Sequence, residues 1–303
     1  MSLAGRDRAN PMGNAMGDAW VRLMPAVFVV IWSTGFIVAR YGTPHAPPLK
    51  FLALRFALSV ACFGVWAVLA RARWPSGAIQ WRHLAVTGLF MHAVYLGGVW
   101  SAVKLGMGAG LVALLVGLQP VLTAVWVSAR GGRVAPVQWA GLALGLAGLA
   151  LVVWQKLGLG EIHPLNFLLA LGALLGITTG TLYQKRFLAP CGVPTANFVQ
   201  NLAALAMTLP LAMWLEAEPI HFNLPLVASM AWSVLVLTLG GSSLLYVLIQ
   251  RGAATAVTSL LYLVPPTTAL MAWALFDEPI TVLTLVGTAL TAIGVGLVVR
   301  SRA

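Results

Sequence analysis

Several polar and aromatic side chains lie inside long apolar stretches of the sequence, where they could hold a solute. His92 and Tyr95, at i and i+3, would share one face of a helix. Trp32 and Phe36, at i and i+4, would share another. Polar groups are costly at membrane depth, so they tend to face a cavity. The candidate substrate-binding residues are Trp32, Ser33, Phe36, His92, Tyr95, Ser242, Tyr246, Ser259 and Tyr262. The chemistry they predict is reversible binding in a cavity lined by aromatic rings and hydroxyl groups.

Several polar groups in these stretches also have a purely structural interpretation. A lone histidine such as His92 is as often a buried group that bonds to a neighbouring helix. Arg55 lies near one end of its apolar stretch and could reach the membrane surface by snorkelling, so we expect a structural role for it. Asn197 and Asn201, at i and i+4, are expected to form hydrogen bonds between helices.

The sequence lacks the residue patterns of metal binding, of nucleotide binding and of nucleophilic catalysis. Cys62 and Cys191 cannot be paired by their spacing and do not match a zinc pattern. No phosphate-binding GxxxxGK[ST] loop occurs, and no nucleophile with a base stands out. We therefore expect no metal and no cofactor, and an ATP-driven pump is disfavoured. A polytopic membrane enzyme is the rival class, but it would need catalytic side chains clustered in loops, and the loops here are short.

The composition indicates an integral membrane protein. Of the 303 residues, 60% are hydrophobic and 8% are charged, with a mean hydropathy of +0.92, whereas a soluble domain has about 25% charged residues. The net charge of +11 comes from basic residues that lie singly between apolar stretches, so it indicates topology signals and no nucleic-acid partner. We expect a lipid bilayer and a small-molecule substrate as partners, and a chain that works as a monomer.

Ten apolar stretches are each long enough to cross about 30 Å of hydrocarbon as a helix. They are continuous rather than alternating, which favours helices over strands. The predicted spans are 21–39, 48–70, 83–100, 109–129, 136–153, 165–182, 195–214, 226–249, 254–276 and 281–299. The predicted fold class is an all-α membrane protein with ten transmembrane helices.

The two halves of the chain repeat one another. Segments 106–153 and 252–299 align without a gap at an offset of 146, which matches Gly106 with Gly252 and Pro120 with Pro266. Five spans per half mean that the second half enters the membrane from the opposite side. We therefore expect two inverted five-helix repeats around a central cavity, an architecture typical of transporters. The predicted units are a tail at 1–20, a first repeat at 21–153 and a second repeat at 165–300.

The charged residues predict the orientation. With the N-terminus inside, most arginines, such as Arg71 and Arg186, fall in inside loops, and the positive-inside rule places these loops in the cytoplasm. We expect both termini on the cytoplasmic side of a bacterial inner membrane. The tryptophans near span ends are interpreted as anchors at the headgroup level. They are Trp20, Trp81, Trp100, Trp139, Trp154 and Trp214.

Small residues and prolines predict helix contacts and bends. Gly176 and Gly180 belong to a four-residue glycine spacing on one span, which lets helix backbones approach closely. Pro120 and Pro266 each remove a backbone donor inside a span and would permit a kink. Because these prolines are equivalent in the two repeats, a hinge for gating is one hypothesis, and a static bend is the other.

Three motifs resemble the drug/metabolite transporter superfamily, EamA type. They are Ile31-Trp32-Ser33, the stretch from Gly106 to Pro120, and Phe276-Asp277-Glu278-Pro279. The resemblance extends over about residues 25–299, and within the superfamily the chain is similar to the YddG group of aromatic amino acid exporters. It implies a ten-helix exporter of small metabolites, with aromatic and other neutral amino acids as substrates. The sequence departs from the pattern at Gly132, which replaces the acidic residue that Glu278 provides in the second repeat.

The distribution of acids bears on the energy source. All seven acids lie in the N-terminal tail or in predicted outside loops, whereas ion-driven carriers commonly use a carboxylate within the membrane. We therefore expect facilitative export by alternating access, with the substrate ammonium held by carbonyls, hydroxyls and aromatic faces. The alternative is a proton-coupled antiporter of drugs or other metabolites that uses His92, the one group at depth that could titrate near pH 7.

The predicted orientation can be tested by labelling. Single cysteines placed at Glu161 and Glu218 should react with an impermeant thiol reagent added outside intact cells, because both positions lie in predicted outside loops. A cysteine placed at Arg186 should not react. Reactivity at Arg186 alone would overturn the orientation.

Overall fold

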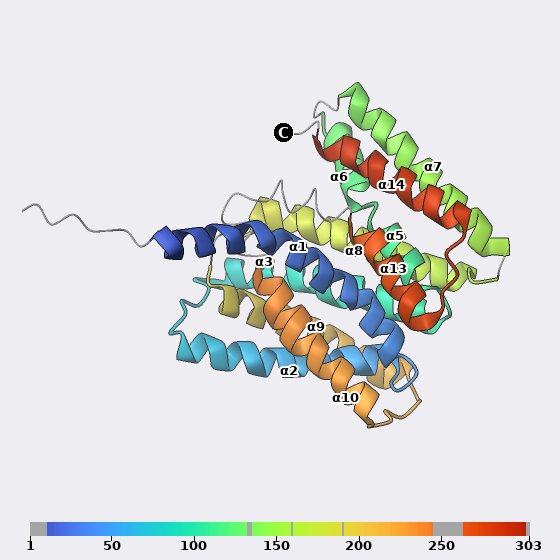
Figure 1. Ribbon diagram of the computed structural model, residues 1–303. Coiled ribbons are helices and arrows are strands. Elements are labelled where there is room, and N and C mark those ends of the chain that lie inside the picture. Colours follow the sequence, from blue (N-terminus) through green and yellow to red (C-terminus); the bar gives the residue numbers. More distant parts are fainter. Residues whose placement is uncertain (1–10, 132–134, 159, 190, 245–262, 301–303) are drawn as a thin grey trace, which may run out of the picture.

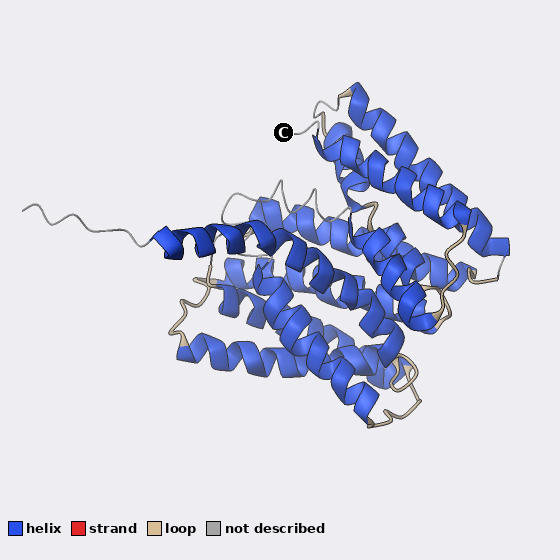
Figure 2. Cartoon of the chain, in the orientation of Figure 1, coloured by secondary structure: helices blue, strands red, loops and turns tan. Residues whose placement is uncertain are grey.

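The computed structural model describes residues 11–131, 135–158, 160–189, 191–244 and 263–300, and all regular structure in these ranges is helical (Figure 2). Seven helical segments are long and apolar enough to cross a membrane. Three shorter apolar helices, Ala26–Gly42, Val264–Phe276 and Val282–Leu297, fall at the remaining predicted spans. The prediction of an all-α membrane protein with ten transmembrane helices is confirmed.

The helices follow one another in two sets of five spans (Figure 1). The first set consists of α1 (Pro11–Gly42), α2 (Pro48–Leu69), α3 (Ala78–Gly88) continued by η1 (Leu89–Val94) and α4 (Tyr95–Lys104), α5 (Ala109–Val116) with α6 (Gln119–Ala129), and α7 (Pro136–Gly158). The second set consists of α8 (Pro164–Phe187), α9 (Val193–Leu215), α10 (Leu224–Ala231) continued by η2 (Trp232–Ser242), α13 (Val264–Phe276) and α14 (Val282–Arg300).

Three boundaries differ from the sequence prediction. Helix α1 begins at Pro11 rather than near residue 21, and the third span starts at Ala78 rather than at residue 83. The fourth span, predicted as one helix, is broken between α5 and α6. The break immediately precedes Pro120, which has no N–H to continue the helical hydrogen bonds of the preceding turn. Pro266 lies in the first turn of α13, where a missing N–H is tolerated.

Contacts between the halves follow an approximate two-fold symmetry. Helix α7 packs on α14, and α2 packs on α9, so that equivalent helices of the two repeats pair with each other. The contact of α9 with η1 is matched by that of α2 with η2. The equivalence extends to helix starts, since α2 and α9 begin 145 residues apart and α7 and α14 begin 146 residues apart. In Figure 1, α6, α7 and α14 gather at one side of the bundle.

Glycines allow α7 and α14 to approach closely. A Cβ atom on Gly148 would fall against the carbonyl oxygen of Gly287 and 2.7 Å from the backbone nitrogen of Thr291. A Cβ atom on Gly294 would fall against the backbone of Gly141 and Gly145. Since Gly141 and Gly287 are equivalent, as are Gly148 and Gly294, these two close approaches are images of each other under the two-fold axis. Backbone contact of this kind associates helices where lipid is as apolar as their side chains.

The five acids outside the N-terminal region gather at one end of the bundle, which we call the acidic end. They are Glu161, Glu216, Glu218, Asp277 and Glu278. Two of them accept hydrogen bonds from the first turns of helices in the other half. Glu216 accepts from the backbone N–H of Leu49 and of Lys50, both at 2.8 Å, at the start of α2. Glu278 accepts from the N–H of Ala109 at 3.0 Å, at the start of α5. A carboxylate at a helix N-terminus satisfies free N–H groups and complements the helix dipole.

The α7–α14 contact predicts the effect of adding one methyl group. The substitution Gly148→Ala should lower the free energy of unfolding by about 1–3 kcal/mol, because the new Cβ overpacks a backbone contact. The matched control is Gly296→Ala in α14, where an added Cβ meets no atom within 4 Å. Thermal unfolding of the detergent-solubilised variants measures both, and equal melting temperatures would contradict the close approach.

Candidate functional site

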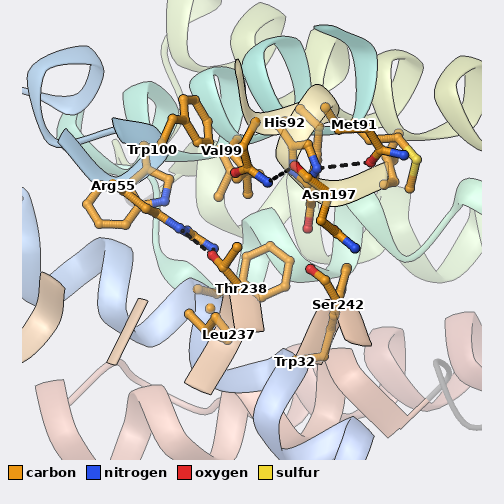
Figure 3. A pocket seen from close by; sticks show the side chains of 18 of the residues that line it. Trp32, Arg55, Met91, His92, Val99, Trp100, Asn197, Leu237, Thr238 and Ser242 are labelled. Atoms are coloured by element: carbon orange, nitrogen blue, oxygen red, sulfur yellow. Dashed lines mark hydrogen bonds between the residues drawn. The ribbon is translucent and has the colours of Figure 1, made fainter. Parts of the chain in front are cut away.

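A cavity lies between the two halves, and the space in it that is free of protein atoms, including the part open to solvent, measures about 1010 Å³. Its walls come from α1 and α2 of the first half, from the η1–α4 segment, and from α8, α9 and η2 of the second half. The polar and aromatic members of the lining are Trp32, Phe36, Arg55, Phe56, His92, Tyr95, Trp100, Gln184, Asn197, Gln200, Asn201, Thr238 and Ser242. Figure 3 shows the labelled members of this set around the cavity.

Two π-helical segments form opposite parts of the wall. The segment η1 presents His92, and the segment η2 presents Thr238. The two residues are 146 apart and therefore equivalent in the repeats. A π-helical turn interrupts the regular backbone bonding of an α-helix and is frequent at functional sites. Both halves thus place an irregular turn in the wall of the cavity.

Two hydrogen-bonded pairs connect the π-helical segments to their neighbours. Arg55 of α2 donates from Nε and Nη2 to Thr238 Oγ1, at 3.2 and 3.1 Å. Gln200 Oε1 of α9 accepts from His92 Nε2 at 3.3 Å. Arg55 and Gln200 are each the eighth residue of their helix and are 145 apart. The pairs are therefore equivalent under the two-fold axis, but one contains a cation and the other a neutral amide.

Aromatic rings complete the wall. Trp32 and Tyr95 both line the cavity, and Tyr95 is 5% exposed. Trp100 is 1% exposed and stacks on Phe51 with ring centroids 4.1 Å apart. Figure 3 shows Arg55 and Trp100 at one side of the cavity and Ser242 at the other. A flat or apolar side chain of a bound solute would find ring faces on more than one wall.

The structure brings five of the nine predicted binding residues to the cavity. They are Trp32, Phe36, His92, Tyr95 and Ser242. Ser33 is fully buried outside the lining, where its hydroxyl donates to Val29 O at 2.8 Å and lies 3.5 Å from Val264 O. Tyr246, Ser259 and Tyr262 lie outside the described residues.

The glycines predicted for packing lie at a helix contact. A Cβ atom on Gly176 would approach Val94 Cγ1 to 2.9 Å, and one on Gly180 would approach Phe90 Cβ to 3.1 Å. Both contacts join α8 to η1, the π-helical segment that presents His92. The two glycines therefore let α8 approach the cavity wall.

Three structural interpretations from the sequence need correction. Arg55 does not extend to the membrane surface, since it is 6% exposed and bonded to Thr238. Trp100 is packed inside the bundle rather than anchored at its surface. Asn197 and Asn201 donate to carbonyls four residues earlier in α9, and both also line the cavity. In each case the sequence indicated depth but not the direction of the side chain.

Gln200 was missed entirely, although a signal was present. An offset of 145 in the second span matches Arg55 with Gln200, and an offset of 146 in the third span matches His92 with Thr238. A polar residue whose equivalent in the other repeat is also polar has two independent indications that its position faces a cavity.

The arrangement favours binding over bond chemistry. Among the described residues no group of three His, Cys, Asp or Glu side chains could hold a metal ion. The described polar lining consists of one guanidinium, one imidazole, amides and hydroxyls. These groups can hold a solute through hydrogen bonds and one positive charge.

Comparison with known proteins supplies relatives over nearly the whole chain. The model of the EamA-like transporter family matches residues 19–154 and again residues 165–300. The chain is 26% identical over 282 residues to the "Probable amino-acid metabolite efflux pump" of Escherichia coli (strain K12), covering 90% of this chain and 92% of that one. It is 25% identical over 296 residues to the "Uncharacterized transporter YvbV" of Bacillus subtilis (strain 168), covering 91% and 90%. A solved crystal structure with a TM-score of 0.66 and 21% identity covers 94% of this chain and 98% of that chain, and shows the same fold.

The Arg55–Thr238 contact predicts a stability effect. The isosteric substitution Thr238→Val should lower the free energy of unfolding by about 1–3 kcal/mol, because it removes a hydrogen-bond acceptor from a buried guanidinium. Thr238→Ser keeps the oxygen and should unfold close to wild type. Unfolding in detergent measures both variants, and a Thr238→Val protein as stable as wild type would show that the contact is dispensable.

Proposed function

The chain belongs to the EamA-like transporter family, and from this premise we propose that it exports amino acids, aromatic and other neutral ones, through the cavity between its halves. The observation that supports the proposal most is the cavity itself, walled by equivalent helices of two inverted repeats. Such a site can be exposed to either side when one half rocks against the other. Two relatives that match most of the chain bear the name "Probable amino-acid metabolite efflux pump". The proposed location is a bacterial inner membrane with both termini in the cytoplasm.

Alternating access would use the contacts at the acidic end as a gate. There Glu216 and Glu278 of the second half bond to helix starts of the first half. Lys104 of the first half forms an ion pair with Glu218 of the second at 3.1 Å. Exposed pairs of this kind contribute only about 0–1 kcal/mol each. These contacts would hold that end closed, yet they can be exchanged for water when the halves rock apart.

A facilitative mechanism agrees best with the cavity lining. The described lining contains no carboxylate that a proton or sodium ion could neutralise. His92 donates its Nε2–H to Gln200, which satisfies a neutral imidazole without an ion. The substrate would then move down its own gradient, and a high cytoplasmic amino acid concentration would drive export.

Proton antiport is the second candidate, and one observation favours it. His92 is half-buried and lines the cavity, so a substrate and a proton could compete there. A membrane enzyme is a weaker reading of the same cavity, because its described lining offers no nucleophile next to a base.

Transport by purified protein in liposomes tests the proposal. Radiolabelled L-phenylalanine, L-threonine, uridine and the cation tetraphenylphosphonium are offered to liposomes preloaded with the same unlabelled compound. We expect exchange of the amino acids, phenylalanine above threonine, and little exchange of uridine or tetraphenylphosphonium. A protein that exchanges uridine or the cation but neither amino acid would contradict the proposed substrate class.

A pH difference distinguishes the two mechanisms. With phenylalanine at equal concentration on both sides, an imposed pH difference should produce no net accumulation, because no proton accompanies the substrate. Accumulation that is lost in a His92→Ala protein, while phenylalanine exchange remains, would establish antiport instead.

A further inference from the structure

Resting on the proposed export of amino acids, we infer that Arg55 binds the carboxylate of the substrate, so that the cavity selects carboxylates and rejects organic cations. The sequence alone favoured the membrane surface for this side chain. Its burial, its hydrogen bonds and the neutral residue at the equivalent position of the other half support the binding role.

Arg55 is a buried cation without an acidic partner. It is 6% exposed and lines the cavity. In the described part of the chain, the ion pairs are Lys104–Glu218 and Lys156–Glu161, and neither includes it. Lys156 is the instructive comparison, because it is buried to a similar degree but contacts its carboxylate at 2.6 Å. A buried charge costs several kcal/mol unless it is paired, so Arg55 is poised for an anion that the protein does not supply.

The hydrogen bonds of Arg55 leave part of its guanidinium free to donate to a ligand. Thr238 donates its hydroxyl hydrogen to Ser233 O at 2.8 Å, so its oxygen can accept from Arg55. Nε and Nη2 both use that single oxygen. A guanidinium has five N–H donors, and three of them have no hydrogen-bond partner among the described residues. These donors suit the two oxygens of a carboxylate.

The equivalent position in the other half is neutral, so the two ends of the cavity differ in charge and would orient a zwitterionic ligand. Gln200 occupies the place of Arg55, and His92 occupies that of Thr238. Each of Arg55 and Gln200 lies seven residues into its helix, about 10 Å from opposite ends of the bundle at 1.5 Å per residue. A carboxylate is therefore favoured near the acidic end, at Arg55. The substrate ammonium is favoured near the side-chain amides of Asn197 and Asn201, whose oxygens can accept its hydrogen bonds, and near Trp32, whose ring face attracts a cation.

The same charge accounts for rejection of cations. No carboxylate in the described lining offsets Arg55, so an amine without a carboxylate would bring a second positive charge into a low-dielectric site. A purely structural role, in which Arg55 only ties α2 to η2, predicts no such discrimination between an acid and an amine of the same shape.

The test compares two fragments of one amino acid. Liposomes containing wild-type protein exchange radiolabelled L-phenylalanine in the presence of 3-phenylpropanoate, which keeps the carboxylate, or phenethylamine, which keeps the amine. The acid should inhibit at a concentration at least ~30-fold lower than the amine, as expected for a buried charge pair. In Arg55→Gln this ratio should fall to near one. The matched control is Arg82→Gln, an exposed arginine of α3, which should keep the wild-type ratio.

Each result decides the proposal. Equal inhibition of wild type by acid and amine, or an unchanged ratio in Arg55→Gln, overturns it. If Arg55→Gln does not fold, Arg55→Lys replaces it. Lysine keeps the charge but lacks the planar pair of donors that suits a carboxylate. An Arg55→Lys protein that binds 3-phenylpropanoate as tightly as wild type overturns the proposal.

The proposed function can fail separately. If wild-type protein does not exchange phenylalanine, that failure counts against amino acid export. Binding of 3-phenylpropanoate and phenethylamine is then followed by tryptophan fluorescence, since Trp32 and Trp100 line the cavity. Quenching by the acid alone, lost in Arg55→Gln, supports the role of Arg55, and quenching by both or by neither overturns it.

Discussion

The hydrocarbon core of a membrane offers no water, so each polar group in the bundle needs a partner within the protein. The backbone meets this constraint by forming helices. The acids of the acidic end lie outside the helices, and there Glu216 and Glu278 accept hydrogen bonds from helix starts. Buried hydroxyls such as that of Ser33 donate to a carbonyl one turn earlier. Arg55 meets the constraint only in part, because a hydroxyl satisfies two of its donors while its charge has no counter-ion in the described chain. This incomplete pairing marks the cavity as a place for something the protein itself lacks.

The cavity lies between two halves that are related by approximate two-fold symmetry, and residues that differ between the halves determine which groups of a ligand it can bind. The α7–α14 contact and the two π-helical segments are close to two-fold related. A site with perfect symmetry would bind equally well in two orientations. The exchange of Arg55 for Gln200 removes that equivalence and distinguishes the two sides of the cavity. A second difference between the halves involves Glu278, which caps α5 at the acidic end, whereas its equivalent in the sequence of the first half is Gly132, which lies outside the described residues.

Much of this architecture follows from the sequence, because hydrophobicity and repeats report on depth and topology. The ten spans and the all-α fold were predicted from apolar length, and His92 and Trp32, predicted as binding residues, lie at the cavity. What the sequence does not report is the face of the helix that turns inward. Trp100 and Ser33 illustrate this, since a tryptophan near a span end proved buried and a serine beside Trp32 faces another helix. The direction of a long side chain near the end of a span, such as that of Arg55, is ambiguous in the sequence. Its hydrogen bond to Thr238 of η2 shows that it is buried rather than extended to the membrane surface.

The central claim is that the cavity between the halves binds an amino acid with its carboxylate at Arg55. An experimental structure of the protein with bound 4-bromo-L-phenylalanine tests it most directly, because anomalous scattering from bromine fixes the ring end independently of the rest of the ligand. The account predicts carboxylate oxygens within hydrogen-bond distance of the Arg55 guanidinium, with the bromine displaced away from it along the cavity. A ligand bound in the reverse orientation, or bound elsewhere with Arg55 still bonded only to Thr238, would contradict the account.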